Sequence, residues 1–555
     1  MMLPILGVSK RLLFYGLPAL AAVSWFPVAA QEQRLNPVHD AYADPDLPFD
    51  HQEGETPPDD SLAAAIAETF TSNPVLAAQR YDLRATDDEI GIALSGIRPT
   101  AQMQVSGNYD YILPGSITQA GRPLSDQLND PHIQRDNVAT QLVIDQPITT
   151  GGRVRSAVRA AAATSAAGRE ALRGAEGDLL VDLIAAYSDV RRDRRSLAIR
   201  GKNVRVLEAT LDEIVARRDA GELTRTDIAQ AETQLLAARV QHNAAEAQLE
   251  ASQAAFVAIV GREPGNLAEE PDLPGLPVSA DEAFAIAEAA NPDLARAVAN
   301  ERASRARIAA ARAEGNPQLS IQGVAGTNGP AVPFDQREHD VTFTGRATLT
   351  IPIVSGGRVR SLVAQAKNRQ SADALRIEAT RRQMVQGVLN AWNQWVTAAR
   401  NLEAQTLQLK AARIYYEGTF EEYREGLRST FDVLYAQNSL RETEVALLAS
   451  KRDRYVAQAI LLRHMGQLEA RQLLAGAPIL DPAEYTKRAA RRGALPSDAL
   501  FRAIDSLGAP MARPQRIETP APATDAVLLP PRAGTVQPRS LVKHGVNQLP
   551  GKEGP

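Results

Sequence analysis

The stretch TTGGRVRSAV runs from Thr149 to Val158, and VSGGRVRSLV runs from Val354 to Val363, so GGRVRS occurs twice. Glycines followed by a cation can cradle a phosphate. A P-loop, however, needs Lys and Ser/Thr directly after its last glycine, whereas arginine and valine follow here. Neither copy lies in a βαβ pattern, which a dinucleotide site requires. The repetition instead indicates that one structural junction is used twice.

Other features of the chain recur with a similar spacing. Asn73-Pro74 and Asn291-Pro292 each predict a helix start, because Asn caps helices and Pro fits the first helical position. Pro99 and Pro317 end these helices. These pairs are 218 residues apart (291 − 73), whereas the GGRVRS copies are 205 apart (356 − 151). The sequence therefore predicts two repeats, at 61–278 and 279–475, with a 13-residue insertion (218 − 205) in the first.

Polar and apolar residues alternate between each proline and the following GGRVRS. The alternation is clear over 101–111 and 341–353 and weaker over 140–148 and 318–325. It predicts strand pairs at about 100–148 and 317–354, each strand with one apolar and one polar face. Strands of roughly 9–11 residues can cross a bilayer at a tilt. Four strands cannot close a barrel alone, and an open edge in lipid leaves backbone groups unsatisfied, so several chains must combine their strands.

Long helical hairpins are predicted after each GGRVRS, at about 152–261 and 357–466. Apolar residues recur every seven positions, which is typical of coiled-coil packing. The first set is Leu183, Val190, Leu197, Val204 and Leu211, and the second is Val388, Trp395, Leu402, Leu409 and Tyr416. A helix over 153–219 would extend about 100 Å. The glycine pairs Gly151-Gly152 and Gly356-Gly357 then mark where a strand turns into a long helix.

The two ends of the chain and its composition predict its export and exclude several kinds of partner and site. Residues 1–30 resemble an export signal, with Lys10 and Arg11 before a short apolar core and small residues at 28–30. The acidic, proline-rich stretch 31–60 predicts a disordered leader, and 476–555 predicts a largely disordered tail. The net charge of −5 argues against a nucleic-acid partner. The chain has no cysteine, which excludes disulfides and thiolate metal sites.

With its duplicated junctions, the sequence resembles the TolC-type outer-membrane efflux proteins. The resemblance covers about 61–466 and rests on the Asn-Pro helix starts, on QPITTGGRVRSAV and TIPIVSGGRVRSLV, and on the turns AGELTRTDIAQAE and EGLRSTFDVLYAQ. It implies an α+β membrane protein: a homotrimer with a twelve-strand outer-membrane β-barrel, four strands per chain, continuing into a periplasmic α-helical coiled-coil barrel. Arg153, Arg155, Arg358 and Arg360 would lie either near outer-membrane lipid headgroups or on plain solvated helix surface.

The resemblance also implies a function. Such proteins are passive exit ducts that dock through a periplasmic adaptor (membrane fusion protein) onto an inner-membrane transporter, either ABC-type or RND-type and proton-driven. The cargo would be secreted protein or drugs.

The same resemblance implies a gate at the periplasmic tip, formed by the two turns at Gly221 and Gly426. Tyr423 and Arg428 match family residues that bond toward Thr226 and Asp227, and Asp432 matches the aspartate at the pore constriction. A further acidic position of the family holds Tyr435 here. Helix capping explains both aspartates equally well, because Thr224–Asp227 and Ser429–Asp432 have capping-box spacing.

No catalytic, cofactor or metal site is expected. The seven histidines are scattered, and neither HExxH nor GxSxG occurs. One rival interpretation is an exported structural or adhesive coiled-coil surface protein, which would share the long heptads but has no need of amphipathic strands. An envelope enzyme is a weaker third.

Overall fold

The computed structural model describes residues 61–113, 123–124, 133–331, 335–473 and 482–507. The expected signal peptide (1–30), the leader (31–60) and positions 476–481 and 508–555 of the expected tail lie outside the described residues.

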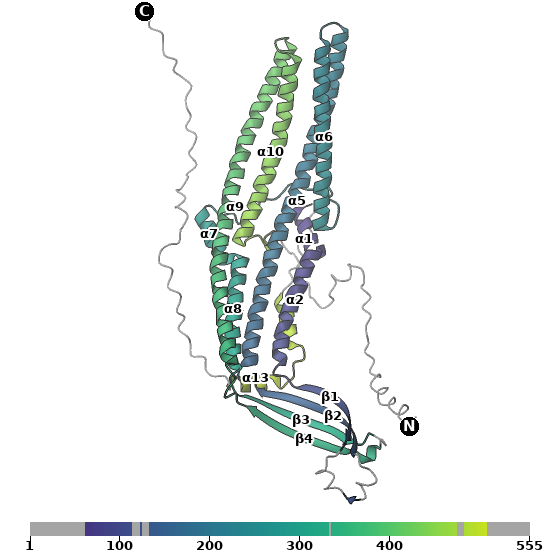
Figure 1. The fold of residues 1–555 in the computed structure, drawn as a ribbon. Helices are drawn as coiled ribbons and strands as arrows, with labels where there is room; N and C mark the ends of the chain where they lie inside the picture. The colour runs from purple at the N-terminus through teal and green to yellow at the C-terminus, as the bar shows by residue number, and fades with distance from the viewer. Residues whose placement is uncertain (1–60, 114–122, 125–132, 332–334, 474–481, 508–555) are drawn as a thin grey trace, which may run out of the picture. The chain divides into compact units, whose positions relative to one another are not determined.

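The first half of the described chain, 61–278, places two strands between short and long helices (Figure 1). Its elements are α1 (Leu62–Ser72), α2 (Pro74–Ser95), β1 (Thr100–Ile112), β2 (Ile133–Thr149), α5 (Arg153–Asp219) and α6 (Arg225–Val260).

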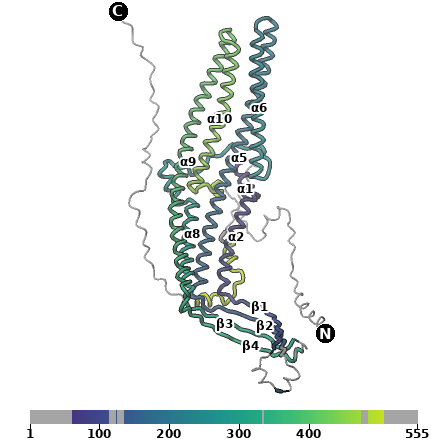
Figure 2. Tube along the Cα trace, viewed as in Figure 1, coloured from purple at the N-terminus to yellow at the C-terminus, as the bar shows by residue number. Residues whose placement is uncertain are grey.

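The second half, 279–473, repeats this order of elements and adds two short helices, and both halves can be followed along the chain in Figure 2. Its elements are α7 (Ala280–Ala290), α8 (Pro292–Ala313), β3 (Gln318–Gly329), the short 3-10 helix η2 (Gln336–Glu338), β4 (Asp340–Thr350), α9 (Arg358–Arg424), α10 (Thr430–Met465) and α11 (Ala470–Leu473). The four helix pairs have equal lengths of 11, 22, 67 and 36 residues.

The two Asn-Pro sequences start helices in the same way. The side chain of Asn73 accepts hydrogen bonds from the first amides of α2, and Asn291 does so for α8. Each asparagine also donates its amide Nδ2 to the end of the following long hairpin, Asn73 to the carbonyl of Ile259 (2.9 Å) and Asn291 to that of His464 (2.8 Å). In both halves, the same asparagine therefore caps a short helix and binds this helix to the end of the long hairpin.

Two heptad positions of α5 and one of α9 lie in the cores beside these anchors, together with residues of α10. Leu183 and Val190 of α5 are fully buried, as are Val388 of α9 and Leu461 of α10. The first pair packs in a cluster with Leu62 and other residues of α1, α6 and α10, and the second pair packs against α7. Burial of apolar area at roughly 25 cal/mol per Å² is the main force that holds the hairpins to the shorter helices.

The four strands form one antiparallel sheet in the order β1-β2-β3-β4. Its register places most of the large apolar residues of the strands on one face, because directly paired residues point to the same side. One such row is Met103, Leu142, Ala325 and Phe343, and another pairs Leu319 with Leu349. The opposite face carries rows such as Gln104, Gln141, Gly326 and Thr342.

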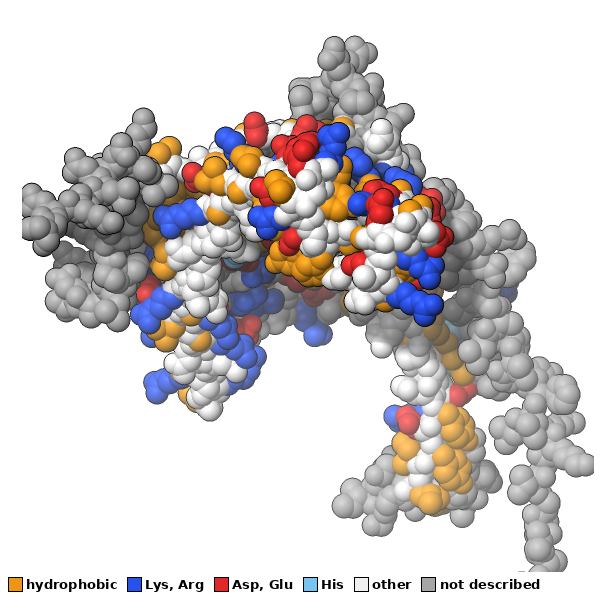
Figure 3. Space-filling model, turned by 90° about the horizontal axis from the view of Figure 1, so that it is seen from above, with side chains coloured by type: hydrophobic (Ala, Val, Ile, Leu, Met, Phe, Trp, Pro, Cys, Tyr) orange, Lys and Arg blue, Asp and Glu red, His pale blue; other side chains and the backbone are white. Residues whose placement is uncertain are grey.

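The apolar face of the sheet is uncovered in the single chain. Met103 is 72% exposed, Phe343 82% and Leu349 58%, and exposed hydrophobic side chains are visible at the molecular surface in Figure 3. Every residue of the edge strands β1 and β4 is exposed. Large exposed apolar surfaces mark contact with a membrane or another protein.

Part of the expected tail is ordered, and the prediction of a loose chain is wrong for 482–507. These residues form α12 (Pro482–Arg491), which packs on α2, and α13 (Asp498–Leu507), which contacts β2 and α5. In α13, two of the buried positions are aspartates, Asp498 and Asp505, a residue type that normally faces water.

Two buried aspartates attach α13 to the ends of the first strand pair. Asp498 pairs with Arg98 (2.9 Å), which lies between α2 and β1 and also donates to the carbonyls of Ala490 and Arg492. Asp505 accepts from the backbone amide of Thr150 (2.6 Å) and from two threonine hydroxyls at the end of β2. α13 thus contacts both corners of the first half, the one where α2 leads into β1 and the one where β2 leads into α5.

Replacement of Asp498 by alanine is expected to release α12 and α13 from this corner. Both side chains of the Arg98–Asp498 pair are 10% exposed, and loss of one partner of a buried pair costs about 3–5 kcal/mol. Limited proteolysis should then cleave within 482–507 many times faster. Arg492→Ala is the matched control, because its ion pair with Asp88 is exposed and such pairs contribute about 0–1 kcal/mol. Equal protease resistance of Asp498→Ala and the parent would contradict this role.

Candidate functional site: hairpin tips and strand–helix junctions

Each long hairpin turns through a left-handed glycine. Gly221 (φ 85°) follows α5 and Gly426 (φ 74°) follows α9. The next amide closes the helix end in both turns, Glu222 donating to the carbonyl of Arg217 and Leu427 to that of Glu422. A side chain at either glycine would be strained in this conformation, so the two turns have the same backbone for the same reason.

The aspartates that follow each turn form capping boxes. Asp227 accepts from the backbone amide and the hydroxyl of Thr224 (both 2.8 Å), and Asp432 accepts from the same groups of Ser429 (3.1 and 2.8 Å). Hydrogen bonds to the backbone and hydroxyl of Thr224 lower the pKa of Asp227, and bonds to the hydroxyl and backbone of Ser429 lower that of Asp432. This stabilisation is present at neutral pH and is lost as acid protonates the carboxylates.

Tyr423 connects the two hairpins. Its hydroxyl accepts a hydrogen bond from Nη1 of Arg217 at 2.6 Å, and the guanidinium lies 5.7 Å from the ring centroid. Arg217 lies in the last turn of α5 and Tyr423 in the last turn of α9. Arg217 could not be singled out from the sequence, because a cation near a helix C-terminus is a common feature.

Of the other predicted tip residues, Arg428 has its partner within its own hairpin. Arg428 pairs with Glu422 at 2.7 Å, and Thr226 is exposed on the first turn of α6. Within the described part of this single chain, neither Tyr423 nor Arg428 bonds to Asp227. Tyr435, in place of the acidic residue of the family, is 61% exposed and stacks with Phe431 at 6.4 Å.

The glycine pairs of GGRVRS have left-handed backbones. Gly151 and Gly152 have φ of 64° and 85°, and Gly356 and Gly357 have 56° and 83°. Two consecutive residues with positive φ redirect the chain sharply, which only glycine does without strain. Gly151 also permits close packing, because a Cβ there would lie 2.5 Å from Cβ of Asn316.

The arginines after these glycines lie near a common acid. Nε of Arg153 is 3.8 Å from Glu314, and Nη1 of Arg358 is 3.5 Å from the other oxygen of the same carboxylate. Glu314 thereby links the beginnings of both long helices.

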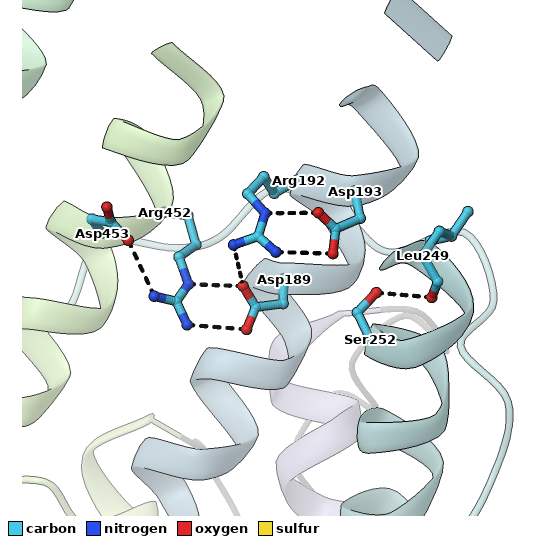
Figure 4. A network of polar contacts seen from close by, with 7 residues as sticks. All are labelled: Asp189, Arg192, Asp193, Leu249, Ser252, Arg452 and Asp453. Atoms are coloured by element: carbon cyan, nitrogen blue, oxygen red, sulfur yellow. Dashed lines mark hydrogen bonds and ion pairs between the residues drawn. The ribbon is translucent and has the colours of Figure 1, made fainter. Parts of the chain in front are cut away.

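A polar network joins α5 to α10 above the core (Figure 4). Arg452 makes a two-point contact with Asp189 (2.9 and 3.0 Å) and also bonds Asp453. Arg192 contacts Asp189 at 2.7 Å and binds both oxygens of Asp193. Paired guanidinium and carboxylate groups at this position hold the two hairpins in a defined arrangement.

The described ranges contain no group of three or more His, Asp or Glu side chains placed to hold a metal ion. None of the described helices is both long and apolar enough to cross a membrane.

Comparisons with known proteins agree with this architecture. The outer membrane efflux protein BepC of Brucella suis is 28% identical over 434 residues, which cover 78% of this chain and 91% of BepC. The toluene efflux pump outer membrane protein TtgC of Pseudomonas putida is 22% identical over 411 residues, covering 74% and 83%. The solved CmeC outer membrane channel of Campylobacter jejuni has the same fold, with a TM-score of 0.64 at 15% identity over 78% of this chain and 89% of CmeC.

The outer membrane efflux protein family matches residues 65–262 and 285–467, which include both long hairpins and all four strands. The chain therefore belongs to the outer membrane efflux protein family and is a protein of the outer membrane.

Proposed function

We propose that this protein is the outer-membrane exit duct of a tripartite export system. Three chains, each built from two copies of one unit, combine their sheets into a twelve-strand barrel in the outer membrane. Their long hairpins form a helical tunnel through the periplasm. The duct conducts substrates passively, and an inner-membrane transporter supplies the energy.

The observation that carries this proposal is the sheet with one apolar face and two free edges. An apolar face that includes Met103, Phe343 and Leu349 is stable against lipid. Edge strands in lipid must be paired, because each backbone N–H or C=O group without a hydrogen bond there costs roughly several kcal/mol. β1 and β4 run in opposite directions in the alternating sheet, so β4 of one chain can pair antiparallel with β1 of the next and close the barrel.

The helices support the second part of the proposal. A 67-residue helix extends about 100 Å at 1.5 Å per residue, which suits a tunnel across the periplasm. The rival interpretation, an adhesive coiled-coil surface protein, offers no use for an exposed apolar sheet face.

The tips form the closed end of the tunnel in this proposal. Tyr423 already holds the end of α9 to Arg217 at the end of α5. In the trimer, Tyr423 and Arg428 also face Thr226 and Asp227 of adjacent hairpins, and Asp432 lines the constriction. A periplasmic adaptor docks at this end and separates the hairpins.

The partner transporter is of the ABC or the RND type. Small apolar molecules are the favoured cargo, because a similar protein is named as part of a toluene efflux pump. Type I protein secretion is the alternative.

A test combines assembly with transport. The protein extracted from outer membranes should migrate as a heat-sensitive trimer and form conducting channels in a planar bilayer. Deletion of its gene from the host should lower resistance to toluene and large antibiotics, and the intact gene should restore it. A monomeric, non-conducting protein would reject the duct. A trimer whose deletion abolishes only protein secretion would assign the alternative cargo.

A further inference from the structure

The helix α13 has its polar and apolar sides reversed. Asp498 and Asp505, seven positions apart and therefore on one side of the helix, are both buried against the first half of the chain. The opposite side carries Leu500, which is 60% exposed, and beside it Ile504, which is half-buried. A helix on the surface of a water-soluble protein buries its apolar side and exposes its charges. The outward side of α13 is therefore suited to an apolar medium.

α13 lies across the ends of the first two strands. Arg98, which pairs with Asp498 at 2.9 Å, lies two residues before β1. Thr150, whose amide donates to Asp505 at 2.6 Å, directly follows β2. Because β1 and β2 are antiparallel neighbours, both corners lie at the same end of the sheet. A helix bonded to both corners runs along this end of the sheet, and Figure 1 shows α13 where the long helices meet the strands.

A further bond shows on which face of the sheet α13 lies. The hydroxyl of Thr149 donates to Asp505 at 3.2 Å. Thr149 pairs with Leu319, which in turn pairs with Leu349. Directly paired residues point to the same side, so the side chain of Thr149 points to the apolar face. α13 is therefore attached at the end of the face that contacts lipid in the proposed duct, on the outside of the barrel.

Cations accompany the apolar side of α13. Arg502 in α13 and Arg491 at the end of α12 are both exposed. Within the described residues neither guanidinium has a carboxylate partner, and Nε of Arg502 donates to the backbone carbonyl of Asp498. When an amphipathic helix lies in a membrane surface, flanking arginines extend toward the charged headgroups. Anionic phosphate groups would supply the partners that these two side chains lack.

The position of α13 favours lipid as the occupant of its outward side. Besides Leu500, Leu495 in the turn before the helix is 42% exposed. In the proposed ring, neighbouring chains meet along the edge strands β1 and β4, whereas α13 contacts β2 and α5. The nearest apolar medium is then the lipid that covers the same face of the sheet.

We propose that α13 lies in the periplasmic leaflet of the outer membrane, with Leu500 and Ile504 against acyl chains. Arg491 and Arg502 bind the phosphates of anionic phospholipids. A helix in this position buries its apolar side about 5–10 Å into the boundary between headgroups and acyl chains. The inference rests on the proposed duct, because it takes the apolar face of the sheet as the lipid-facing one. Its residues, however, lie outside the family match, which ends at 467.

Quenching by lipid-attached nitroxides tests this position in full-length protein reconstituted into vesicles of phosphatidylethanolamine and phosphatidylglycerol. The chain contains no cysteine, so Leu500→Cys gives a single site for an NBD fluorophore. A nitroxide near the headgroups should quench this label strongly, and a nitroxide deep in the acyl chains should quench it less. Lys410→Cys is the control, because it is exposed on α9 and roughly 80 Å from the start of that helix. Neither lipid nitroxide should quench it.

A label at Phe343→Cys separates failure of this inference from failure of the proposed function. Phe343 is on the apolar face of β4, and lipid nitroxides should quench its label. If they quench the label at 343 but not the one at 500, the inference is overturned while the duct stands. Aqueous iodide then shows whether water or a protein segment covers α13. A label at 343 that no lipid nitroxide quenches would instead reject the lipid-facing sheet and the proposed function.

Anionic lipid provides an independent measurement. Replacement of phosphatidylglycerol by phosphatidylcholine should lower the quenching of the label at 500 about twofold, because arginines near a membrane surface are attracted to anionic lipid. Arg491→Gln with Arg502→Gln should remove this dependence, whereas Lys410→Gln should retain it. Equal dependence on phosphatidylglycerol in the parent and in the double variant would overturn the binding of phosphates by these arginines.

Discussion

Leu349→Arg is expected to prevent stable insertion of the protein into the outer membrane, whereas Thr348→Arg should be tolerated. Leu349 is on the apolar face of β4, paired with Leu319, and Thr348 is on the polar face, paired with Ser320. An arginine that faces mid-bilayer costs about 2–4 kcal/mol, and three chains would each incur this cost. On the polar face, the added charge would project into water.

The measurement is the yield of heat-sensitive trimer in the outer-membrane fraction. The two positions are adjacent and both exposed in the single chain, so they differ mainly in the face of the sheet they occupy. Equal yields for the two variants would show that this face does not contact lipid. Loss of both trimers would show that β4 tolerates no charge on either side.

Tyr423→Phe combined with Arg428→Ser is expected to raise single-channel conductance several-fold and to sensitise cells to large antibiotics. The tips lie at the ends of the longest helices, where a small change in helix direction alters the opening most. Tyr423→Phe removes the hydroxyl that accepts from Arg217, and Arg428→Ser removes the pair with Glu422. The capping boxes of Asp227 and Asp432 stay intact, so the trimer should assemble in normal amounts.

The bond between Arg217 and Tyr423 allows a sharper version of this test. Arg217→Ala should reproduce most of the effect of Tyr423→Phe, because it removes the donor of the same hydrogen bond. Arg218→Ala removes the same charge from the next residue, whose side chain bonds its neighbour Asp219 and does not reach α9 within the described residues, and should leave conductance unchanged. If the assembled double variant conducts like the parent, Asp227 and Asp432 are helix caps and the tip is closed by other contacts.

Local chemistry made much of this molecule predictable from its sequence. The glycine pairs of GGRVRS were expected at strand–helix junctions, and both pairs have the positive φ that only glycine adopts freely. Asn73 and Asn291 cap the helices that they were expected to start. The alternation in the strands also determined which residues share a face, because side chains along a strand alternate with period two. Each of these features depends on residues close together in the chain.

Contacts between distant segments were decided only by the tertiary structure. The sequence identified Tyr423 but not its partner Arg217, because a side chain at a helix end can reach several groups and the choice depends on how α5 and α9 pack. The places where α13 is attached could not be predicted, because Asp498 and Asp505 are polar residues that normally face water, and their partners Arg98 and Thr150 lie about 350 to 400 positions earlier in the chain. Likewise, the equal patterns of α5 and α9 gave no indication that only α5 is covered on both sides. Periodicity shows which face of a helix is apolar, whereas the segment that covers this face depends on how the whole chain folds.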